Sequence, residues 1–202
     1  MEFLRDIFGP SKYKIWQQVA DEIGGQFESG GFFGKDILRF RSGQWEITLD
    51  ILSGGEDYSS CNRMRAPFVN KEGLKFEIYK GSIASSIGKY FGMQDIQVKD
   101  RLFDDKYIVK GNKVDRIKLL LQDENLKDLI RFQGDVYFSV RDDDGSFGVA
   151  FPRGVDELYF ESEQEIKDVD QLKCLFELFS ATLMRLVEID SAFETDPMIR
   201  LN

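Results

Sequence analysis

An alternating run in the first quarter of the chain constrains the fold most strongly. Leu38 and Phe40 alternate with charged residues, and after a turn at Ser42-Gly43 the apolar residues of 45–51 alternate with polar ones. Successive side chains of a β-strand point to opposite faces of a sheet. A two-residue turn that pairs Phe40 with Trp45 places the apolar partners on one face. The run therefore predicts an antiparallel hairpin with one buried face.

A second strong pattern lies near the C-terminus, where apolar residues recur every three or four positions. The spacing predicts a long helix over roughly 168–189. Its apolar stripe is wide, which indicates a helix packed on a sheet. The stripe comprises Leu172, Leu175, Phe176, Phe179, Leu183, Leu186 and Val187.

Weaker patterns predict the remaining elements. Helices are expected over 2–8, over 12–23 after an N-cap at Ser11, over 82–91, and after caps at Asn112 and Asp123. Strands are expected over 63–69, 74–80, 106–110, 136–140, 147–151 and 157–162, with 136–140 paired to 147–151 across a loop. Asp104-Asp105 is expected to be a turn that enters the strand 106–110.

These elements predict an α+β fold, built mainly on antiparallel sheet with helices packed on it and a long C-terminal helix. No linker rich in Pro, Gly or Ser divides the chain, so residues 1–202 are expected to form one domain, with 190–202 as a tail. The halves 11–92 and 101–189 can each be written as helix, three strands, helix. Their residues do not align convincingly, so a duplication remains an open possibility.

The complete absence of histidine excludes several chemistries. Ser-His-Asp and Cys-His arrangements cannot be built, and neither can an H-E-x-x-H zinc site. Cys61 and Cys174 are far apart and belong to no C-x-x-C pair, so no zinc or dithiol motif is indicated. Cys174 lies in an apolar helical run and is expected to be a buried thiol. An enzyme with this composition would depend on carboxylates, lysine, tyrosine or a metal held by oxygen.

Charge is distributed unevenly along the chain. Residues 1–100 carry 13 bases and 14 acids, for a net charge of −1, whereas residues 101–202 carry 14 bases and 22 acids, for −8. That field repels phosphate backbones and anionic membranes, so no nucleic-acid or membrane partner is expected. No apolar run is long enough to span a bilayer, and no signal peptide is recognised, so a cytoplasmic location is expected.

Three motifs resemble functional sites, but a structural interpretation is favoured for each. The loop 30-GGFFGK-35 has Ser29 and Asp36 where a phosphate loop requires glycine and a hydroxyl residue. The loop 142-DDDG-145 lacks the terminal ligands of a calcium-binding loop and suits a turn. Asp104-Asp105 would point to opposite faces of a strand. The acidic run from Asp156 to Asp170 is expected to be a solvated surface, with a basic partner as the alternative.

Several segments carry a family resemblance. They are 7-IFGPSKYKIWQQVADEIGG-25, 64-MRAPFVNKEGLKFEIYK-80, 87-IGKYFGMQDIQV-98, 103-FDDKYIVKGN-112, 154-GVDELYF-160 and 167-KDVDQLKCLFELF-179. On these the chain resembles a group of uncharacterised bacterial proteins and, more distantly, the domain-of-unknown-function 3137 family. The segments span almost the whole chain, so the resemblance implies one structural unit. It implies no activity, cofactor or catalytic residue.

The leading hypothesis is a non-enzymatic protein–protein interaction module. Its candidate surface combines arginine on an expected edge strand with an exposed methionine and an amide in an expected loop. These residues are Arg63, Arg65, Met93, Gln94 and Asp95. The alternative is a carboxylate-dependent enzyme or a small-ligand-binding protein with an aromatic pocket. No motif indicates a catalytic residue, a metal or a cofactor.

Overall fold

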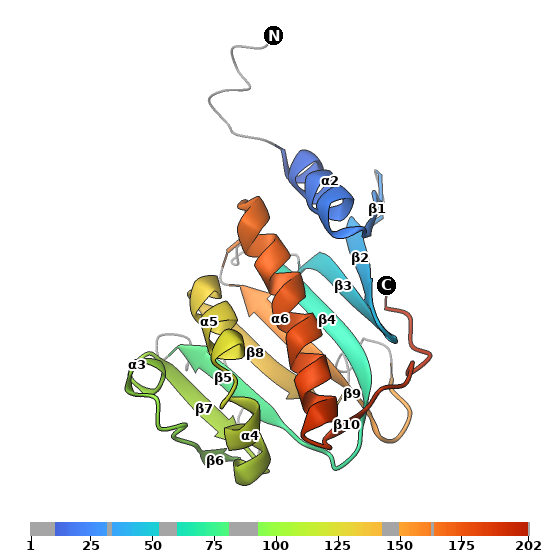
Figure 1. Cartoon of the computed structure of the whole chain (residues 1–202). Helices are drawn as coiled ribbons and strands as arrows, with labels where there is room; N and C mark the ends of the chain where they lie inside the picture. The colour runs from blue at the N-terminus through green and yellow to red at the C-terminus, as the bar shows by residue number, and fades with distance from the viewer. Residues whose placement is uncertain are drawn as a thin grey trace.

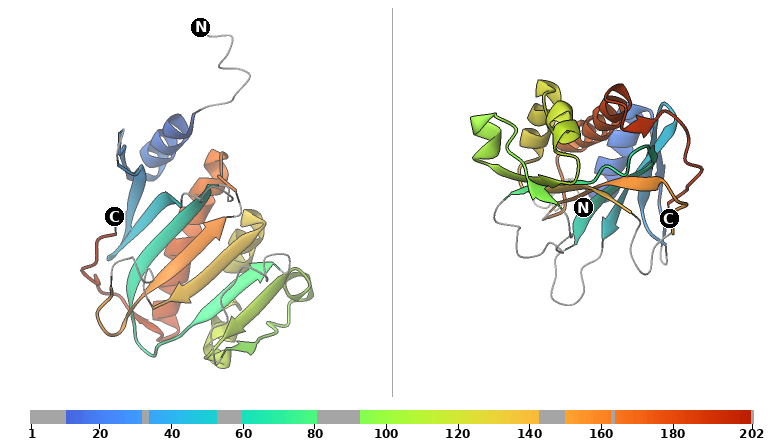
Figure 2. Two further views of the ribbon diagram at one scale, coloured as in Figure 1. Left: turned by 180° about the vertical axis from the view of Figure 1, so that it is seen from behind. Right: turned by 90° about the horizontal axis from the view of Figure 1, so that it is seen from below.

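The computed structural model describes residues 11–31, 34–52, 60–80, 93–142, 150–162 and 164–201. Within these ranges all ten strands form one antiparallel sheet, and the helices cover one face of it (Figures 1 and 2). The strand order is β1-β2-β3-β4-β9-β8-β5-β7-β6, with β10 beside β4. The predicted α+β class with a mainly antiparallel sheet is confirmed.

The strands are β1 (Gln26–Glu28), β2 (Ile37–Ser42), β3 (Trp45–Leu52), β4 (Cys61–Asn70), β5 (Phe76–Lys80), β6 (Gln94–Asp95), β7 (Tyr107–Gly111), β8 (Val136–Arg141), β9 (Val155–Ser162) and β10 (Ala192–Phe193). The helices of the described ranges are α2 (Lys12–Ile23), α3 (Arg101–Asp104), α4 (Val114–Leu120), α5 (Glu124–Gln133) and α6 (Val169–Glu188). The helices expected over 2–8 and 82–91 lie outside the described residues.

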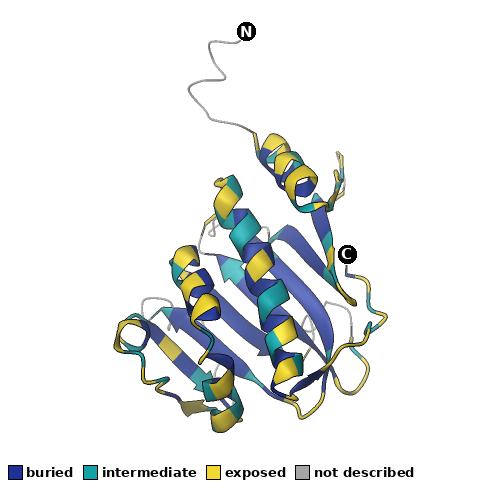
Figure 3. Ribbon diagram, viewed as in Figure 1, coloured by how far each residue is buried: buried dark blue, intermediate teal, exposed yellow. Residues whose placement is uncertain are grey.

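Helix α6 crosses the centre of the sheet, as its wide stripe predicts. The Asp168 carboxylate caps the helix by accepting a 2.7 Å bond from the amide of Gln171. Apart from the half-buried Val187 the stripe is buried against the sheet, while the opposite side of the helix carries half-buried and exposed residues (Figure 3). The predicted long C-terminal helix is confirmed within one residue at each end. None of the helices in the described ranges is long and apolar enough to cross a membrane.

The two faces of the sheet differ sharply in chemistry because side chains alternate along every strand. One cross-strand row faces the helices and is apolar in all eight strands that it crosses; it begins at the half-buried Phe27 of β1 and is buried in the other seven. The seven buried residues are Leu38, Leu49, Met64, Phe160, Phe138, Ile78 and Val109. The neighbouring row faces the other way and is polar in all nine strands that it crosses. It consists of Gln26, Arg39, Thr48, Arg65, Tyr159, Ser139, Glu77, Lys110 and Asp95.

The first hairpin forms with a different register from the predicted one. Phe40 pairs with Ile47, not with Trp45, and Ser42 pairs with Trp45 across a turn at Gly43-Gln44. A shift of two residues keeps every side chain on its face, so apolar alternation cannot distinguish the two registers. Gly43 has φ of 57°. The observed turn places this residue at the first central position, where hairpin turns favour positive φ.

The predicted pairing of β8 with residues 147–151 is wrong. Strand β8 is hydrogen-bonded to β9 on one side and to β5 on the other. Both of its edges are therefore occupied. The short distance along the chain favoured a local hairpin. The strand that occupies this edge is instead β5, which lies more than fifty residues earlier in the sequence.

Two local predictions in the segment 101–112 also change. Asp104 belongs to α3 and not to the predicted turn, whereas Asp105 does lie in a turn before β7; the Asp104 carboxylate accepts bonds from the amides of Val98 (3.0 Å) and Lys99 (3.1 Å). Asn112 does not cap α4, because its side chain bonds the backbone of Lys75 and Gly73, each at 2.8 Å. These contacts hold the approach to β5 against the end of β7.

Residues 190–201 follow α6 and lie along the sheet (Figure 1). Ala192 and Phe193 pair with β4. Leu201 is buried, and its carbonyl accepts a 2.8 Å bond from Nη2 of Arg39. Asp196 forms an ion pair with Arg41 at 2.8 Å. The segment therefore contributes contacts to β2 and β4.

Candidate functional site

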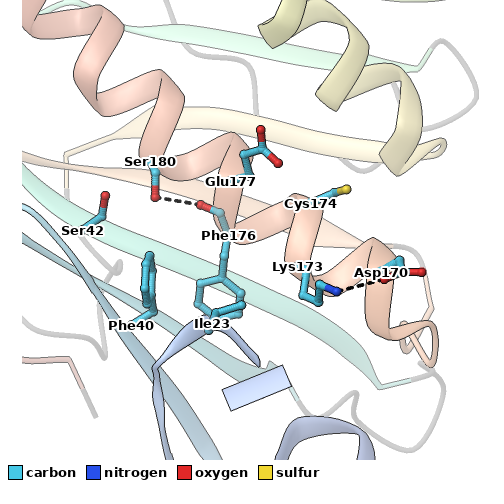
Figure 4. Close-up of a pocket in the computed structure, with 9 residues that line it drawn as sticks. All are labelled: Ile23, Phe40, Ser42, Asp170, Lys173, Cys174, Phe176, Glu177 and Ser180. Carbon is cyan, nitrogen blue, oxygen red and sulfur yellow. Dashed lines mark hydrogen bonds and ion pairs between the residues drawn. The ribbon is translucent and has the colours of Figure 1, made fainter. Parts of the chain in front are cut away.

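Helix α2, strand β2 and helix α6 enclose an open groove of about 640 Å³ (Figure 4). Its lining residues are Ile23, Phe40, Ser42, Asp170, Lys173, Cys174, Phe176, Glu177 and Ser180. We call this the α2–α6 groove. More than a hundred residues separate its two sides in the sequence, so the sheet and α6 together bring them into contact.

The floor of the α2–α6 groove is apolar. Phe40 and Phe176 meet edge to face, with ring centroids 5.9 Å apart and an interplanar angle of 81°. Phe40 is on the helix-facing side of β2, and Phe176 belongs to the buried stripe of α6. Ile23, at the end of α2, completes the floor. Ile23 and Phe40 are only half-buried, so the groove presents apolar surface to solvent.

The rim of the groove is acidic. The Lys173 ammonium donates to carboxylate oxygens of Glu22 (2.7 Å) and Asp170 (3.1 Å). These two bonds raise the pKa of Lys173, and the bond from Lys173 lowers the pKa of Glu22. Glu177 is exposed beside them. Two carboxylates therefore bind the one ammonium, and a third lies exposed one turn further along α6.

Cys174 also lines the groove, but it is a poor nucleophile. Burial raises the pKa of its thiol, and the nearby Glu177 carboxylate acts in the same direction. The thiol form therefore predominates at neutral pH. Cys61 is likewise free, and burial followed by the charge of Glu161 raises its pKa to about 11. The expectation that Cys174 is buried is wrong: the residue is half-buried, because it lies on the side of α6 that lines the groove.

The sheet face that the helices leave uncovered (Figure 2) carries a second polar cluster. The phenol of Tyr137 donates a 3.0 Å bond to Oε1 of Glu77, and the phenol of Tyr159 donates a 2.6 Å bond to Oε2 of Glu161. The guanidinium of Arg141 lies over the ring of Tyr159, 3.3 Å from its centroid. We call these five residues the tyrosine cluster. No described helix covers this face, yet Glu77, Tyr137 and Tyr159 are buried.

Burial governs ionisation in the tyrosine cluster. It raises the pKa of Tyr137 to about 12 and raises that of Tyr159 further. It also raises the pKa of Glu77, although the bond from Tyr137 and the charges of Lys110 and Arg141 act in the opposite direction. Perturbed ionisable groups gathered on one surface are typical of functional sites and also of structural networks.

Arg63 and Arg65 lie next to each other on β4 and share one partner. Nε and Nη2 of Arg63 bond the two carboxylate oxygens of Asp50 at 2.8 and 2.5 Å, and Nη2 of Arg65 reaches Oδ2 at 3.0 Å. The expectation of an edge strand is wrong, because β4 lies between β3 and β9. Arg65 has no exposed surface. Sequence reasoning missed Asp50, which pairs directly opposite Arg63.

Met93, Gln94 and Asp95 lie at the far edge of the sheet from β3 and β4. Gln94 and Asp95 form β6, which pairs with β7 and ends the strand order of the described residues. Four strands separate β6 from β4, so the structure does not bring the two parts of the predicted surface together. Met93 is half-buried, whereas Gln94 and Asp95 are exposed. Among the described residues, no group of three potential ligands could hold a metal ion.

Comparisons with known proteins assign no function. No family model matches the chain, and no curated protein matches it. One solved structure with a similar arrangement is the crystal structure of the mycobacterial trehalose monomycolate transport factor A, TtfA. It shares 5% sequence identity at a TM-score of 0.47, and the match covers 93% of this chain and 97% of that chain.

Proposed function

We propose that the chain is a non-enzymatic protein-interaction module that binds an apolar peptide segment of a partner protein in the α2–α6 groove. The observation that carries this proposal is the half-buried apolar floor of Ile23 and Phe40 beside Phe176. Covering such a surface releases water from apolar groups at roughly 25 cal/mol per Å². Contiguous exposed apolar surface is typical of interaction sites.

The charges around the groove favour a peptide over a reacting small molecule. Lys173 bonds to both Glu22 and Asp170 along the rim. These bonds leave the apolar floor free of charged groups. Catalysis by carboxylates requires acids that converge on one reacting atom. The groove instead has an apolar base with charges at its border, which is the general arrangement of a protein-binding surface.

Selection from a displayed peptide library tests this proposal. Peptides enriched by the intact chain are expected to bind with dissociation constants near the micromolar range. Phe40→Ala removes part of the floor, and Ser42→Gln introduces a larger neutral side chain into the groove. Each is expected to weaken binding by at least about tenfold.

A matched control separates groove binding from general effects. Thr195 is exposed and does not line the groove, so Thr195→Gln should leave binding unchanged. Circular dichroism establishes that each variant is folded. The proposal is wrong if no peptide is enriched, or if Phe40→Ala and Ser42→Gln bind the selected peptides as the intact chain does.

A carboxylate-dependent enzyme or a small-ligand-binding protein is the second candidate. The tyrosine cluster favours it, because Glu77 is buried beside hydroxyl and guanidinium groups. Thermal-shift measurements with a metabolite panel test this alternative. A stabilising metabolite whose effect is lost in Glu77→Gln but kept in Ser42→Gln would support the alternative over peptide binding.

Other features stay predictions from the sequence. They are the cytoplasmic location, the lack of nucleic-acid and membrane partners, and the resemblance to the domain-of-unknown-function 3137 family. The acidic composition supports the predicted lack of nucleic-acid and membrane partners, since a net charge of −9 disfavours binding to phosphate-rich surfaces.

A further inference from the structure

We infer that the segment bound in the α2–α6 groove is a basic amphipathic helix, an inference that rests on the proposed peptide binding. The charged residues of α6 that line the groove are Asp170, Lys173 and Glu177, spaced three and four residues apart. This spacing places all three on one side of α6. The Glu177 carboxylate is directed away from Phe40 (Figure 4), so a partner that rests on the apolar floor and extends over α6 would pass all three.

The single cation in this lining cannot offset the acids. Lys173 is held between Glu22 and Asp170, and its side chain is only 35% exposed. The Asp170 side chain is 77% exposed and Glu177 is also exposed, so both remain accessible to a partner. With three carboxylates and one ammonium, the groove border carries a net charge of about −2 at neutral pH.

Neighbouring residues extend the same negative field. Asp168 is the exposed N-cap of α6 and Glu165 precedes it by three residues, while the exposed Lys167 between them offsets one of these two charges. Residues 101–202 together carry 14 bases and 22 acids. Complementary charge accelerates association and selects among partners, while like charges brought together disfavour binding. An apolar segment flanked by lysine or arginine fits this border, and one flanked by acids does not.

The backbone around the groove favours a helical partner over an extended one. Ile23 and the residues from Asp170 to Ser180 belong to helices, whose main-chain groups bond within the helix. Phe40 and Ser42 are paired with β3. These elements offer side chains for contact, whereas strand addition requires a free sheet edge. A helix satisfies its own backbone bonds and can present apolar side chains at i, i+3, i+4 and i+7.

Two synthetic peptides test the inference. Both carry leucine and phenylalanine at the same positions of one helical face; lysine fills the other face of the first and glutamate that of the second. The lysine peptide is expected to bind the intact chain at least about tenfold more tightly than the glutamate peptide. Glu177→Lys should reduce this preference several-fold, and raising the salt concentration should also reduce it.

Glu188→Lys provides the matched control. It makes the same change of net charge on the same helix, about 16 Å further along the axis. The preference for the lysine peptide should persist in this variant. Equal binding of the two peptides, tighter binding of the glutamate peptide, or equal effects of Glu177→Lys and Glu188→Lys would overturn the charge inference.

The Ser42→Gln variant distinguishes failure of the charge inference from failure of the proposed peptide binding. Both peptides should bind it weakly if they occupy the groove. Peptides that bind in the groove without a charge preference would refute the basic partner and leave the interaction module standing. Absence of binding at about 1 mM, or binding that Ser42→Gln does not alter, would refute both.

Discussion

Asp50 and Arg65 form an ion pair in the interior of the molecule, with 3.0 Å between Oδ2 and Nη2 and no exposed surface on either side chain. Asp50 also accepts two bonds from Arg63 on the same strand as Arg65. One carboxylate from β3 therefore holds two guanidinium groups of β4. This arrangement fixes part of the polar face and leads to the first prediction.

Asp50→Ala should lower the free energy of unfolding by about 3–5 kcal/mol, because it leaves buried guanidinium charge without this carboxylate. Urea unfolding at neutral pH measures the loss. Asp135→Ala is the control, since it breaks a half-exposed ion pair with Lys80 and should cost less than about 1 kcal/mol. Similar losses in the two variants would contradict the central role of the buried pair.

Glu77 should make the chain lose stability as the pH rises. Burial raises its pKa in the folded protein. The protonated form is therefore favoured by folding, and this stabilisation is complete below the unfolded value of about 4.3 and is lost as the pH rises through the folded value. Glu77→Gln mimics the protonated form, so the stability of the native chain relative to this variant should fall as the pH rises above the unfolded value. A constant or rising difference in urea unfolding would refute the prediction.

Asp100 should have the opposite pH dependence. Its bond from Lys127, helped by the amide of Phe103 and by Arg131, lowers its pKa to about 2. The stabilisation is present above the unfolded value of about 3.9 and is lost as the pH falls through the folded value. Asp100→Asn keeps a side chain able to cap α3 and removes the charge. Thermal unfolding should show a native advantage near pH 6 that shrinks below pH 4; a pH-independent difference would count against these ion pairs.

Gly111→Ala should destabilise the fold by about 1–3 kcal/mol. A Cβ atom at this position would be 2.8 Å from the carbonyl oxygen of Lys75 and would overlap Cδ1 of Ile117. Ile117→Val removes the overlapping carbon, so the double variant should lose less stability than the sum of the two single variants. Denaturant unfolding of all three variants measures the coupling, and strict additivity would show that Ile117 does not restrict this position.

Local periodicity predicted the elements that depend on nearby residues. The stripe of α6, the limits of α2 and the cap at Asp123 follow from side-chain spacing and short-range hydrogen bonds. Alternation in β2 and β3 predicted which side chains face the core. It could not predict the register, because a two-residue shift preserves both faces.

The candidate sites depended far more on long-range pairing. Phe176 was predicted to be part of a buried stripe, but only the folded chain places it against Phe40 on the floor of the α2–α6 groove. Arg63 and Arg65 were identified by residue type, while their partner Asp50 became evident only from the pairing of β3 and β4. Residue types alone do not specify which side chains will be neighbours.

The sequence by itself determined the longer helices and strands of the described residues and which side of each is apolar, because those properties depend on spacing along the chain. Only the tertiary structure decided the strand order. It placed β4 in the sheet interior and β5 between β8 and β7. Many apolar strand faces can cover the same helices equally well, so the choice among them depends on simultaneous packing and hydrogen bonding across the whole sheet.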